Sequence, residues 1–422
     1  IFQSMASRVD GFSKPTRHAK AFVLQPLRVG SRSATRGVRS SLPIDAPEQF
    51  FAWHRDTFTA CSAVVLPCLA NRYRGRGRGR DKRLRRTVTA TLALPEIVKG
   101  QDTIIEAVQA IAGPVASLEE VTPGPGLQNR HFRMTCRSGD TFLAKVYKGD
   151  SAAFEGEHAG LQALALAATG TNVVVPQSYA LGNLPDRLGS FLVIDFIRFI
   201  PFGPSIPEVL ERLGHGLAEI HVHEPCDGAT HDVSYGFHGL QTYLGGTPQD
   251  NTICSTFDNF FIEQRLRPQL DRACLKFQHR YGTDNESITA VARLYERVLD
   301  SARKILEPVR IRKPSLLHGD LWTGNTGATQ TRHPILVDPA CWYGDAEFDL
   351  ALSQLFGRFG PRFYDAYFEA RPKDSGFEDR QRVYLLYHML NQANLHGAGL
   401  GRGGNAEHPG GYLEQAIAVM EQ

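Results

Sequence analysis

The stretch LLHGDLWTGN, residues 316–325, decides the fold of this chain. Two leucines lead into a His-Gly-Asp turn, and Asn325 follows Asp320 after five positions. Thirteen residues beyond Asn325, a second apolar run, ILV, ends at Asp338. Short apolar runs of this kind indicate strands, so the pattern places two carboxylates and one amide just beyond strand-like segments.

This spacing meets the needs of phosphoryl transfer. Transfer from ATP requires a base that accepts a hydroxyl proton, oxygen ligands for Mg²⁺ and a lysine that holds the phosphates. Asp320 stands at the position of the base in the kinase catalytic loop H-R-D-x-x-x-x-N, and Asn325 stands at the position of its magnesium-binding Asn. Asp338 takes the place of the kinase DFG aspartate. We therefore expect Asn325 and Asp338 to supply oxygen ligands to Mg²⁺.

A lysine suited to hold the phosphates lies earlier in the chain. Residues 132–147 alternate in polarity around a Ser-Gly-Asp turn, which predicts a β-hairpin that carries Lys145. The helix predicted over residues 151–170, with Gly170 at its C-cap, places Glu157 on the buried stripe. Burying a carboxylate without a partner is costly, so we expect Glu157 to pair with Lys145. The alternative is a glutamate at the margin of the stripe that reaches solvent.

The remaining pattern predicts a small β-rich region followed by a larger helical one. A short amphipathic helix is expected over residues 102–113, and further strands over 173–176 and 190–197 complete a small antiparallel sheet. Helices are expected over residues 207–223, 257–280, 286–307, 346–356, 361–369, 379–396 and 410–421. The fold class is therefore α+β, with a β-rich N-lobe and an α-helical C-lobe.

Composition limits the class of protein. At 422 residues with 42% hydrophobic content, the chain is long enough for two or three ordinary domains. Its seven cysteines form no CxxC pair and are odd in number, which argues against a disulfide framework or a zinc cluster. The apolar run at residues 58–70 is too short to span a bilayer, so no membrane association is expected.

The N-terminal part differs in charge from the rest. Residues 1–95 carry 18 Lys and Arg against 5 Asp and Glu, whereas residues 96–422 carry 29 against 39. Residues 1–44 are basic and rich in Ser, Thr, Ala and Gly, as organelle transit peptides are. We expect residues 1–94 to be a disordered targeting or linker extension and the protein to reach a plastid. A mitochondrial or cytoplasmic location remains an alternative, as does RNA binding by the arginine-rich run at 71–86.

Longer strings carry a closer resemblance. They are GPVASLEEV (113–121), FEGE (154–157), the stretch 316–325, DPACWYGDAEFDLALSQLFG (338–357) and LNQANLHG (390–397). These strings resemble the fructosamine kinase (ketosamine-3-kinase) family, which shares a protein-kinase-like bilobal fold with aminoglycoside phosphotransferases and choline kinases. The resemblance covers residues 95–422. It implies an N-lobe with the nucleotide site over 95–200 and a C-lobe with the catalytic loop and acceptor site over 201–422.

The resemblance also implies roles for individual residues. Asp320 is then the base, Asn325 and Asp338 bind magnesium, and Lys145 with Glu157 forms the ion pair that anchors the phosphates of ATP. The hinge that contacts adenine is IDFI (194–197), with Asp195, Phe196 and Ile197. One departure concerns the phosphate loop, PGPGLQN (123–129), which has Leu and Gln about where many members have a cysteine. Redox control through that thiol is therefore not expected.

The activity implied by the resemblance is phosphorylation of the sugar O3 of a ketosamine, the adduct of a sugar with an amine or a protein lysine. Residues 339–347 leave no room for a protein-kinase activation segment, so an open acceptor cleft is expected. We expect Trp322 and Asn394 to contact the substrate; plain packing between the lobes is the alternative for Trp322. Glu347 and Asp349 are expected to brace a helix start and a loop.

Other functions remain open on the sequence. A small-molecule kinase of the same fold that acts on an aminoglycoside, choline or homoserine would share Asp320, Asn325 and Asp338. A pseudokinase or an RNA-associated factor is a second class, but the complete residue set and the acidic balance of residues 96–422 argue against both. The expected partners are ketosamines and glycated proteins rather than nucleic acid, and the expected state is a monomer.

Overall fold

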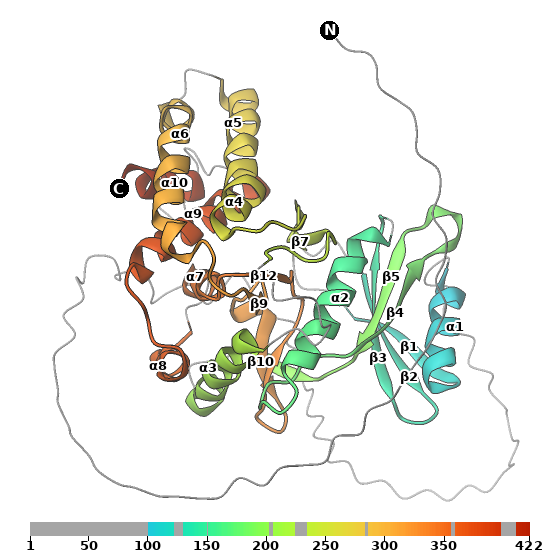
Figure 1. Ribbon diagram of the computed structural model, residues 1–422. Coiled ribbons are helices and arrows are strands. Elements are labelled where there is room, and N and C mark those ends of the chain that lie inside the picture. The colour runs from blue at the N-terminus through green and yellow to red at the C-terminus, as the bar shows by residue number, and fades with distance from the viewer. Residues whose placement is uncertain are drawn as a thin grey trace, which may run out of the picture. The chain divides into compact units, whose positions relative to one another are not determined.

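The computed structural model describes residues 100–121, 130–149, 151–201, 206–223, 234–282, 286–355, 359–397 and 411–422 (Figure 1). The basic extension and the loop at 123–129 lie outside these residues. Within them, a β-rich part precedes a mainly helical part, as the sequence predicts.

The β-rich part is one antiparallel sheet of five strands in the order β1-β2-β3-β5-β4. The strands are β1 (Val115–Val121), β2 (Arg130–Cys136), β3 (Thr141–Tyr147), β4 (Ser178–Asn183) and β5 (Ser190–Asp195). The predicted hairpin is β2 and β3, in which Phe132 pairs with Ala144 and His131 pairs with Lys145.

Alternation along the strands sends side chains to two different cores. On one face, Phe132 and Ala144 pack in a cluster with Ile104 and Val108 of helix α1 (Gln101–Ala112). The opposite face bears Leu192 and Ile194 of β5, which belong to the core cluster of helix α2 and the helical part. Figure 1 shows α1 and α2 on opposite sides of the sheet.

Helix α2 (Ala152–Ala167) buries the expected stripe, with Phe154, Leu161 and Leu164 in the core. It ends earlier than predicted, because Ala168 rather than Gly170 is the C-cap residue. Gly170 still has a positive φ of 86°, so it reverses the chain just beyond the helix.

One strand prediction in this region is wrong, and two strands of the sheet were not predicted. Residues 173–176 do not join the sheet; instead Val174 forms an isolated parallel bridge with Ile335 in the helical part. Strand β1 and strand β4 were not predicted, and they form the two edges of the sheet. An apolar run indicates a buried strand but does not specify its partner.

The helical part agrees with the sequence to within about two residues at most helix ends. Its helices are α3 (Pro207–Val222), α4 (Phe257–Phe261), α5 (Arg267–Tyr281), α6 (Glu286–Leu306), α7 (Glu347–Leu355), α8 (Pro361–Ala370), α9 (Phe377–His396) and α10 (Gly411–Glu421). The predicted helix 257–280 is interrupted by a π-helical turn at Ile262–Leu266. Pro268 follows this turn and has no N–H to continue the regular hydrogen bonding.

Short strands carry the motifs between the helices. A three-stranded sheet has the order β11-β10-β6, with β6 (Phe199–Pro201), β10 (Thr326–Thr329) and β11 (Pro334–Leu336). Two further pairs are β9 (Ser315–Leu317) with β12 (Trp342–Gly344), and the hairpin of β7 (Thr242–Leu244) and β8 (Thr247–Gln249). The predicted catalytic residues all follow β9 or β11.

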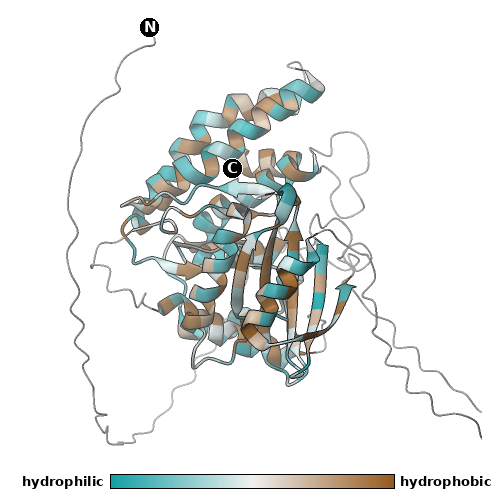
Figure 2. Cartoon of the chain, turned by 90° about the vertical axis from the view of Figure 1, so that its right-hand side faces the viewer, coloured by the Kyte–Doolittle hydropathy of each residue, from teal (hydrophilic) through white to brown (hydrophobic). Residues whose placement is uncertain are grey.

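Hydropathy along the chain agrees with this packing. In Figure 2 the helices alternate between hydrophilic and hydrophobic segments, as elements with one solvent-facing side do. None of the helices in the described ranges has the length and apolar character needed to cross a bilayer.

Candidate active site

The turn after β9 presents Asp320. Gly319 in this turn has a φ of 78°, and a Cβ atom at this position would lie 2.1 Å from the backbone oxygen of Ala340. Only glycine therefore allows the His-Gly-Asp turn to approach the segment after β11 so closely. Ala340 completes the contact, since its N–H donates to the backbone oxygen of His318 at 2.8 Å.

Asn325 is held against Asp320. Its side-chain Nδ2 donates to the backbone oxygen of Asp320 and to Oδ2 of the same residue, both at 2.9 Å. A longer contact of 3.5 Å joins Nδ2 to the backbone oxygen of Asp338. The amide thus links the first carboxylate of the motif to the segment that carries the second.

Asp338 follows β11 in a left-handed conformation, with a φ of 54°. Such a φ is uncommon outside glycine and is often found at functional sites. The preceding residue is fixed, because the N–H of Val337 donates to the backbone oxygen of Asn325 at 3.0 Å. The Asp338 side chain is 44% exposed, so it is accessible to a ligand.

Lys145 joins the β-rich part to this segment. Its buried Nζ contacts Oε1 of Glu157 at 2.5 Å and also forms an ion pair with Asp338. The pairing expected from the helical position of Glu157 is therefore present. One ammonium group connects β3, α2 and the residue after β11.

The charges of Lys145 and Asp338 stabilise each other, whereas burial, with the nearby Asp338 charge, raises the pKa of Glu157 despite its pairing with Lys145. Burial by itself favours the neutral form of Lys145, but the carboxylates of Asp338 and Glu157 outweigh burial and raise the pKa of the ammonium. For Asp338, burial acts to raise the pKa, and the Lys145 charge more than compensates, so the pKa of this carboxyl is lowered. Lys145 is therefore protonated and Asp338 ionised at neutral pH.

Asp320 has a different electrostatic environment. Burial raises the pKa of its carboxyl to about 7; the hydrogen bond from Asn325 opposes this shift, and the negative charge of Asp338 adds to it. A carboxylate with a pKa near the working pH is well suited to accept a proton.

Asp349 stabilises the His-Gly-Asp turn through hydrogen bonds, as expected. This fully buried residue of α7 accepts hydrogen bonds from the backbone N–H of His318 at 2.7 Å and of Gly319 at 2.8 Å. Its Oδ2 also lies 3.2 Å from Nε2 of His221, which belongs to α3. Glu347, at the start of the same helix, is held by Arg380 through two hydrogen bonds of 2.7 and 2.8 Å.

The predicted hinge lies at the end of β5, and two of its residues already form hydrogen bonds within the chain. The Asp195 side chain turns toward β4, where it accepts hydrogen bonds from the Tyr179 hydroxyl and the Gln177 N–H. Phe196 is tied to Thr141 through its N–H at 3.1 Å. The Ile197 N–H has no hydrogen-bond partner in the described ranges, so this donor is available to a ligand.

The two predicted substrate residues lie in different surroundings. Trp322 folds back on its own loop, since a Cβ atom on Gly324 would lie 2.3 Å from its ring. Asn394 sits on α9 and donates to Oε1 of Gln269 on α5 at 2.7 Å. None of its hydrogen bonds to described residues reaches the cluster around Asp320, so its contact with substrate remains a prediction.

A hairpin of the helical part touches α2 next to Glu157. A Cβ atom on Gly156 would lie 2.1 Å from the backbone oxygen of Gln241, which directly precedes β7. Side-chain hydrogen bonds hold the hairpin together and attach it to α9. Thr242 donates to Gln249 within the hairpin, and Gln249 donates to the Tyr387 hydroxyl on α9 at 2.8 Å. The position of Glu157 thus depends on a contact with the helical part.

Three residues of this region were missed by sequence reasoning. His131 and Arg133 lie on the same face of β2 as Lys145 of β3, and Arg198 follows the hinge. Burial, together with the nearby Lys145 charge, lowers the pKa of His131 to about 4, so its imidazole is neutral. The alternation of β2 contained a signal for the first two, because residues 131, 133 and 135 share the face opposite to Phe132.

The donor set suits a hard divalent cation. The carboxylate of Asp338 is partly exposed; Asn325 donates through Nδ2, and its Oδ1 accepts no hydrogen bond from a described residue. No cluster of three or more His, Cys, Asp or Glu side chains forms a metal site in the described ranges. Mg²⁺ does not need one, since it usually takes one or two protein oxygens and completes its shell with phosphate and water.

The chain is similar to known proteins over this region. Residues 102–406 match the family model described as fructosamine kinase. A protein-ribulosamine 3-kinase, chloroplastic, from Arabidopsis thaliana is 38% identical over 276 residues, which is 65% of this chain and 77% of that protein. The protein of the same name from Oryza sativa subsp. japonica is 38% identical over 247 residues, or 58% of this chain. That match spans 65% of the rice protein, slightly less than two thirds of its length.

A solved structure shows a similar fold. The protein from Thermobifida fusca that is assigned as a fructosamine-3-kinase superposes with a TM-score of 0.59 at 28% identity, covering 76% of this chain and 98% of that one. The similarity extends over both the β-rich and the helical part, and it confirms the predicted bilobal, kinase-like α+β fold.

Proposed function

Because the chain belongs to the fructosamine kinase family, we propose that it is an ATP-dependent ketosamine 3-kinase. One observation carries this proposal: Lys145 connects Glu157 with Asp338, beside the turn that holds Asp320. Phosphoryl transfer depends mainly on positioning and charge stabilisation, and this arrangement supplies both.

The donor nucleotide is held at three places. Lys145 contacts the phosphates of ATP, and Glu157 keeps the lysine in position. The free N–H of Ile197 binds the edge of the adenine ring at the hinge. Asp338 and Asn325 would hold Mg²⁺, and the bound ion would supply positive charge against the phosphate oxygens.

In the transfer step, the O3 hydroxyl of the sugar attacks the γ-phosphorus of ATP. Asp320 accepts the hydroxyl proton, a bond forms between O3 and phosphorus, and the bond from phosphorus to the bridging β,γ-oxygen breaks to release ADP. Asn325 keeps the Asp320 carboxylate oriented through its hydrogen bond of 2.9 Å to Oδ2. A pKa of about 7 for Asp320 leaves a substantial ionised fraction at neutral pH.

The acceptor is a ribulosamine or fructosamine, either on a small amine or on a protein lysine. The protein-ribulosamine 3-kinase name of the plant relatives supports this class. Phosphate on C3 stands next to the C2 carbonyl, so once C1 loses a proton and the 1,2-enaminol forms, phosphate can leave from C3. Hydrolysis of the resulting imine at C1 then releases the free amine. We place Trp322 next to the acceptor because it follows the base by two residues, and Asn394 remains a second candidate.

The test is a phosphate-transfer assay with the chain, Mg-ATP and a panel of ribulosamines, fructosamines, choline and aminoglycosides. Transfer to a ketosamine with phosphate on O3, assigned by nuclear magnetic resonance, is the expected result. Transfer only to choline or an aminoglycoside would favour another small-molecule kinase of the same fold. Absence of transfer to every acceptor would favour a pseudokinase.

We also propose that the protein acts in a plastid. The plant relatives are named chloroplastic, and residues 1–44 carry eight Lys and Arg against one acid. A fusion of residues 5–95 to a fluorescent protein should enter plastids. A diffuse cytoplasmic signal, with the first 90 residues retained in the mature protein by mass spectrometry, would contradict this.

A further inference from the structure

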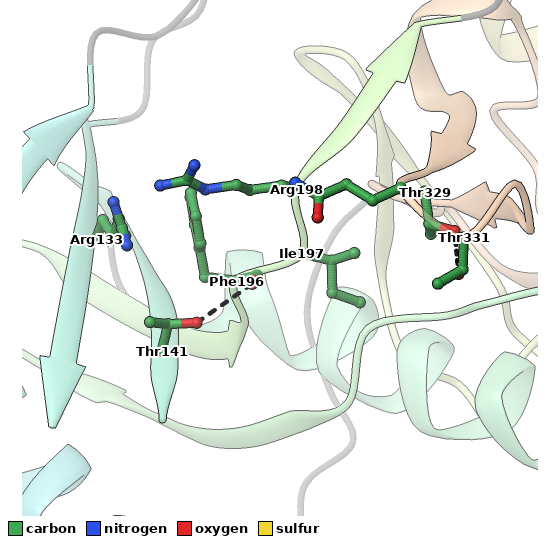
Figure 3. Close-up of a pocket in the computed structure, with 8 residues that line it drawn as sticks. Arg133, Thr141, Phe196, Ile197, Arg198, Thr329 and Thr331 are labelled. Carbon is green, nitrogen blue, oxygen red and sulfur yellow. Dashed lines mark hydrogen bonds between the residues drawn. The ribbon is translucent and has the colours of Figure 1, made fainter. Parts of the chain in front are cut away.

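A cavity of about 430 Å³ opens beside the hinge, between the two parts of the described chain. It is lined by residues from β2, β3, the hinge and the turn between β10 and β11. The lining residues are Arg133, Thr141, Phe196, Ile197, Arg198, Thr329, Gln330 and Thr331 (Figure 3). The lining holds two cations, several hydroxyl groups and no carboxylate.

The two arginines face the same space. The guanidinium of Arg133 lies 4.9 Å from the centre of the Phe196 ring, and Figure 3 shows the side chain of Arg198 pointing toward Arg133 beside that ring. Neither arginine forms an ion pair with a carboxylate of the described residues. Nε of Arg133 is buried and has no hydrogen-bond partner within the same ranges.

The buried Nε of Arg133 is the part of this arrangement that lacks a partner, whereas Arg198 is exposed and its charge is screened by solvent. An anion between the guanidinium groups would supply the missing partner and neutralise both charges. Phosphate is the best match, because the planar N–H fork of arginine fits its oxygens in pairs. The hydroxyl groups of Thr329 and Thr331 form a hydrogen bond with each other at 3.0 Å, so at most one of their two protons is available to the ligand.

The cavity is distinct from the position of Lys145. Arg133 pairs with Leu143 of β3. Lys145 lies two residues beyond Leu143 on the same strand, a distance of about 7 Å along the strand. Ile197 also lines this cavity, so a nucleotide with its base at Ile197 and its 5′-phosphates at Lys145 would lie beside the two arginines. A second phosphate on the ribose is a group that would reach them.

We propose that Arg133 and Arg198 form a binding site for a phosphate monoester, separate from the site of the transferred phosphate. The ligand is an adenine nucleotide that carries a 2′- or 3′-phosphate in addition to its 5′-phosphate, or free inorganic phosphate. Such a nucleotide competes with ATP for the hinge, so the cavity makes the kinase sensitive to ribose-phosphorylated nucleotides. This inference rests on the nucleotide site proposed above.

Titration calorimetry with the full chain tests the site. The probes are AMP, adenosine 3′,5′-bisphosphate, adenosine 2′,5′-bisphosphate and inorganic phosphate. We expect at least one bisphosphate to bind about tenfold or more tightly than AMP, with the advantage shrinking as salt is raised. In Arg133→Gln and Arg198→Gln, the bisphosphate should bind about as tightly as AMP, while the affinity for AMP itself changes little.

Arg137→Gln is the matched control, because Arg137 is exposed just beyond β2 and does not line the cavity. It should retain the full advantage of the bisphosphate. Thermal unfolding of each variant shows whether the fold is intact. Binding of inorganic phosphate that depends on both arginines would also support the site and identify free phosphate as its ligand.

The outcomes separate this inference from the proposed function. If AMP and ATP fail to bind the unmodified chain, the nucleotide site itself is wrong. If AMP binds, but neither bisphosphate gains over it and inorganic phosphate shows no dependence on the arginines, the phosphate site is overturned while the kinase proposal stands.

Discussion

Asp349 holds the backbone of Gly319 in place: its Oδ1 accepts a hydrogen bond from the Gly319 N–H at 2.8 Å. The same carboxylate accepts from the N–H of His318, so it fixes the two residues before the predicted base. Replacing Asp349 with Ala leaves buried donors without a partner, which costs about 1–3 kcal/mol per group. We expect lower unfolding free energy in urea and a kcat reduced by about tenfold or more.

Asp349→Asn is the informative companion, since one acceptor oxygen remains. It should keep most of the stability and lose part of the activity. If both variants turn over normally at a temperature where they are folded, Asp349 has no role in positioning the turn.

Lys145 and Glu157 should differ in their effects. Lys145→Met removes the cation that pairs with Asp338 and that we propose to contact the phosphates, so kcat should fall by about 10²-fold or more. Glu157→Gln removes only the group that positions the lysine and should reduce kcat less. Steady-state kinetics with Mg-ATP checks the order, and a larger defect in Glu157→Gln would mean that the roles are misassigned.

Asp338 is expected to act through the nucleotide and its metal. Asp338→Ala removes an oxygen donor and the second partner of Lys145. The KM for Mg-ATP should rise and kcat should fall, with kcat/KM lower by about 10²-fold or more. Titration of Mg²⁺ at fixed ATP is the specific measurement, because an unchanged magnesium dependence would contradict a role as metal ligand.

The pH dependence of kcat/KM should reflect the ionisation of Asp320. Only its ionised form accepts a proton, and its raised pKa of about 7 belongs to the free enzyme, which kcat/KM reports. We therefore expect kcat/KM to be constant above this pH and to fall about tenfold for each further unit of acid below it. Asp320→Asn should lower kcat by about 10²–10⁴-fold and should lack this acid limb. A variant with the same limb would assign the titration to another group.

Gly156 tests the contact between α2 and the hairpin of β7 and β8. Alanine in a helix interior is intrinsically preferred over glycine by about 0.5–1 kcal/mol. Here its Cβ would lie 2.1 Å from the Gln241 oxygen, and overpacking of this kind costs about 1–3 kcal/mol. Gly156→Ala should therefore displace α2, weaken the pairing of Glu157 with Lys145 and raise the KM for ATP.

Glu155→Ala, one residue earlier on the exposed side of α2, is the control and should leave the KM unchanged. If Gly156→Ala is more stable than the unmodified chain and has the same KM for ATP, the hairpin does not position α2.

The sequence identified the elements better than their partners. Most helices of the C-terminal part follow from their periodic apolar residues, and the hairpin around Lys145 follows from alternation. The run at 173–176 shows the limit, because its apolar residues fit either part of the fold and Val174 pairs with Ile335 instead of the sheet. Strand β1 was missed because its Glu119 and Glu120 face solvent at the sheet edge.

For the site, the motif placed Asp320, Asn325 and Asp338 in order along the chain, and the structure brings them together with Lys145 and Glu157. The brace from Asp349 was also expected. Arg133 and Arg198 could not be paired from the sequence, since no spacing rule joins the middle of a strand to a residue beyond a hinge 65 positions later. Only the folded chain places them at one cavity.

The bridge between Val174 and Ile335 affects how the lobes can move. The covalent connection through the hinge enters β6, which pairs with β10, and the bridge forms a second attachment elsewhere on the same small sheet. Together with the contact between Gly156 of α2 and Gln241 before β7, this bridge ties the β-rich part to the helical part at points outside the hinge. A displacement of the β-rich part must break or shift these contacts, so the hinge residues alone do not determine how far the two parts can separate.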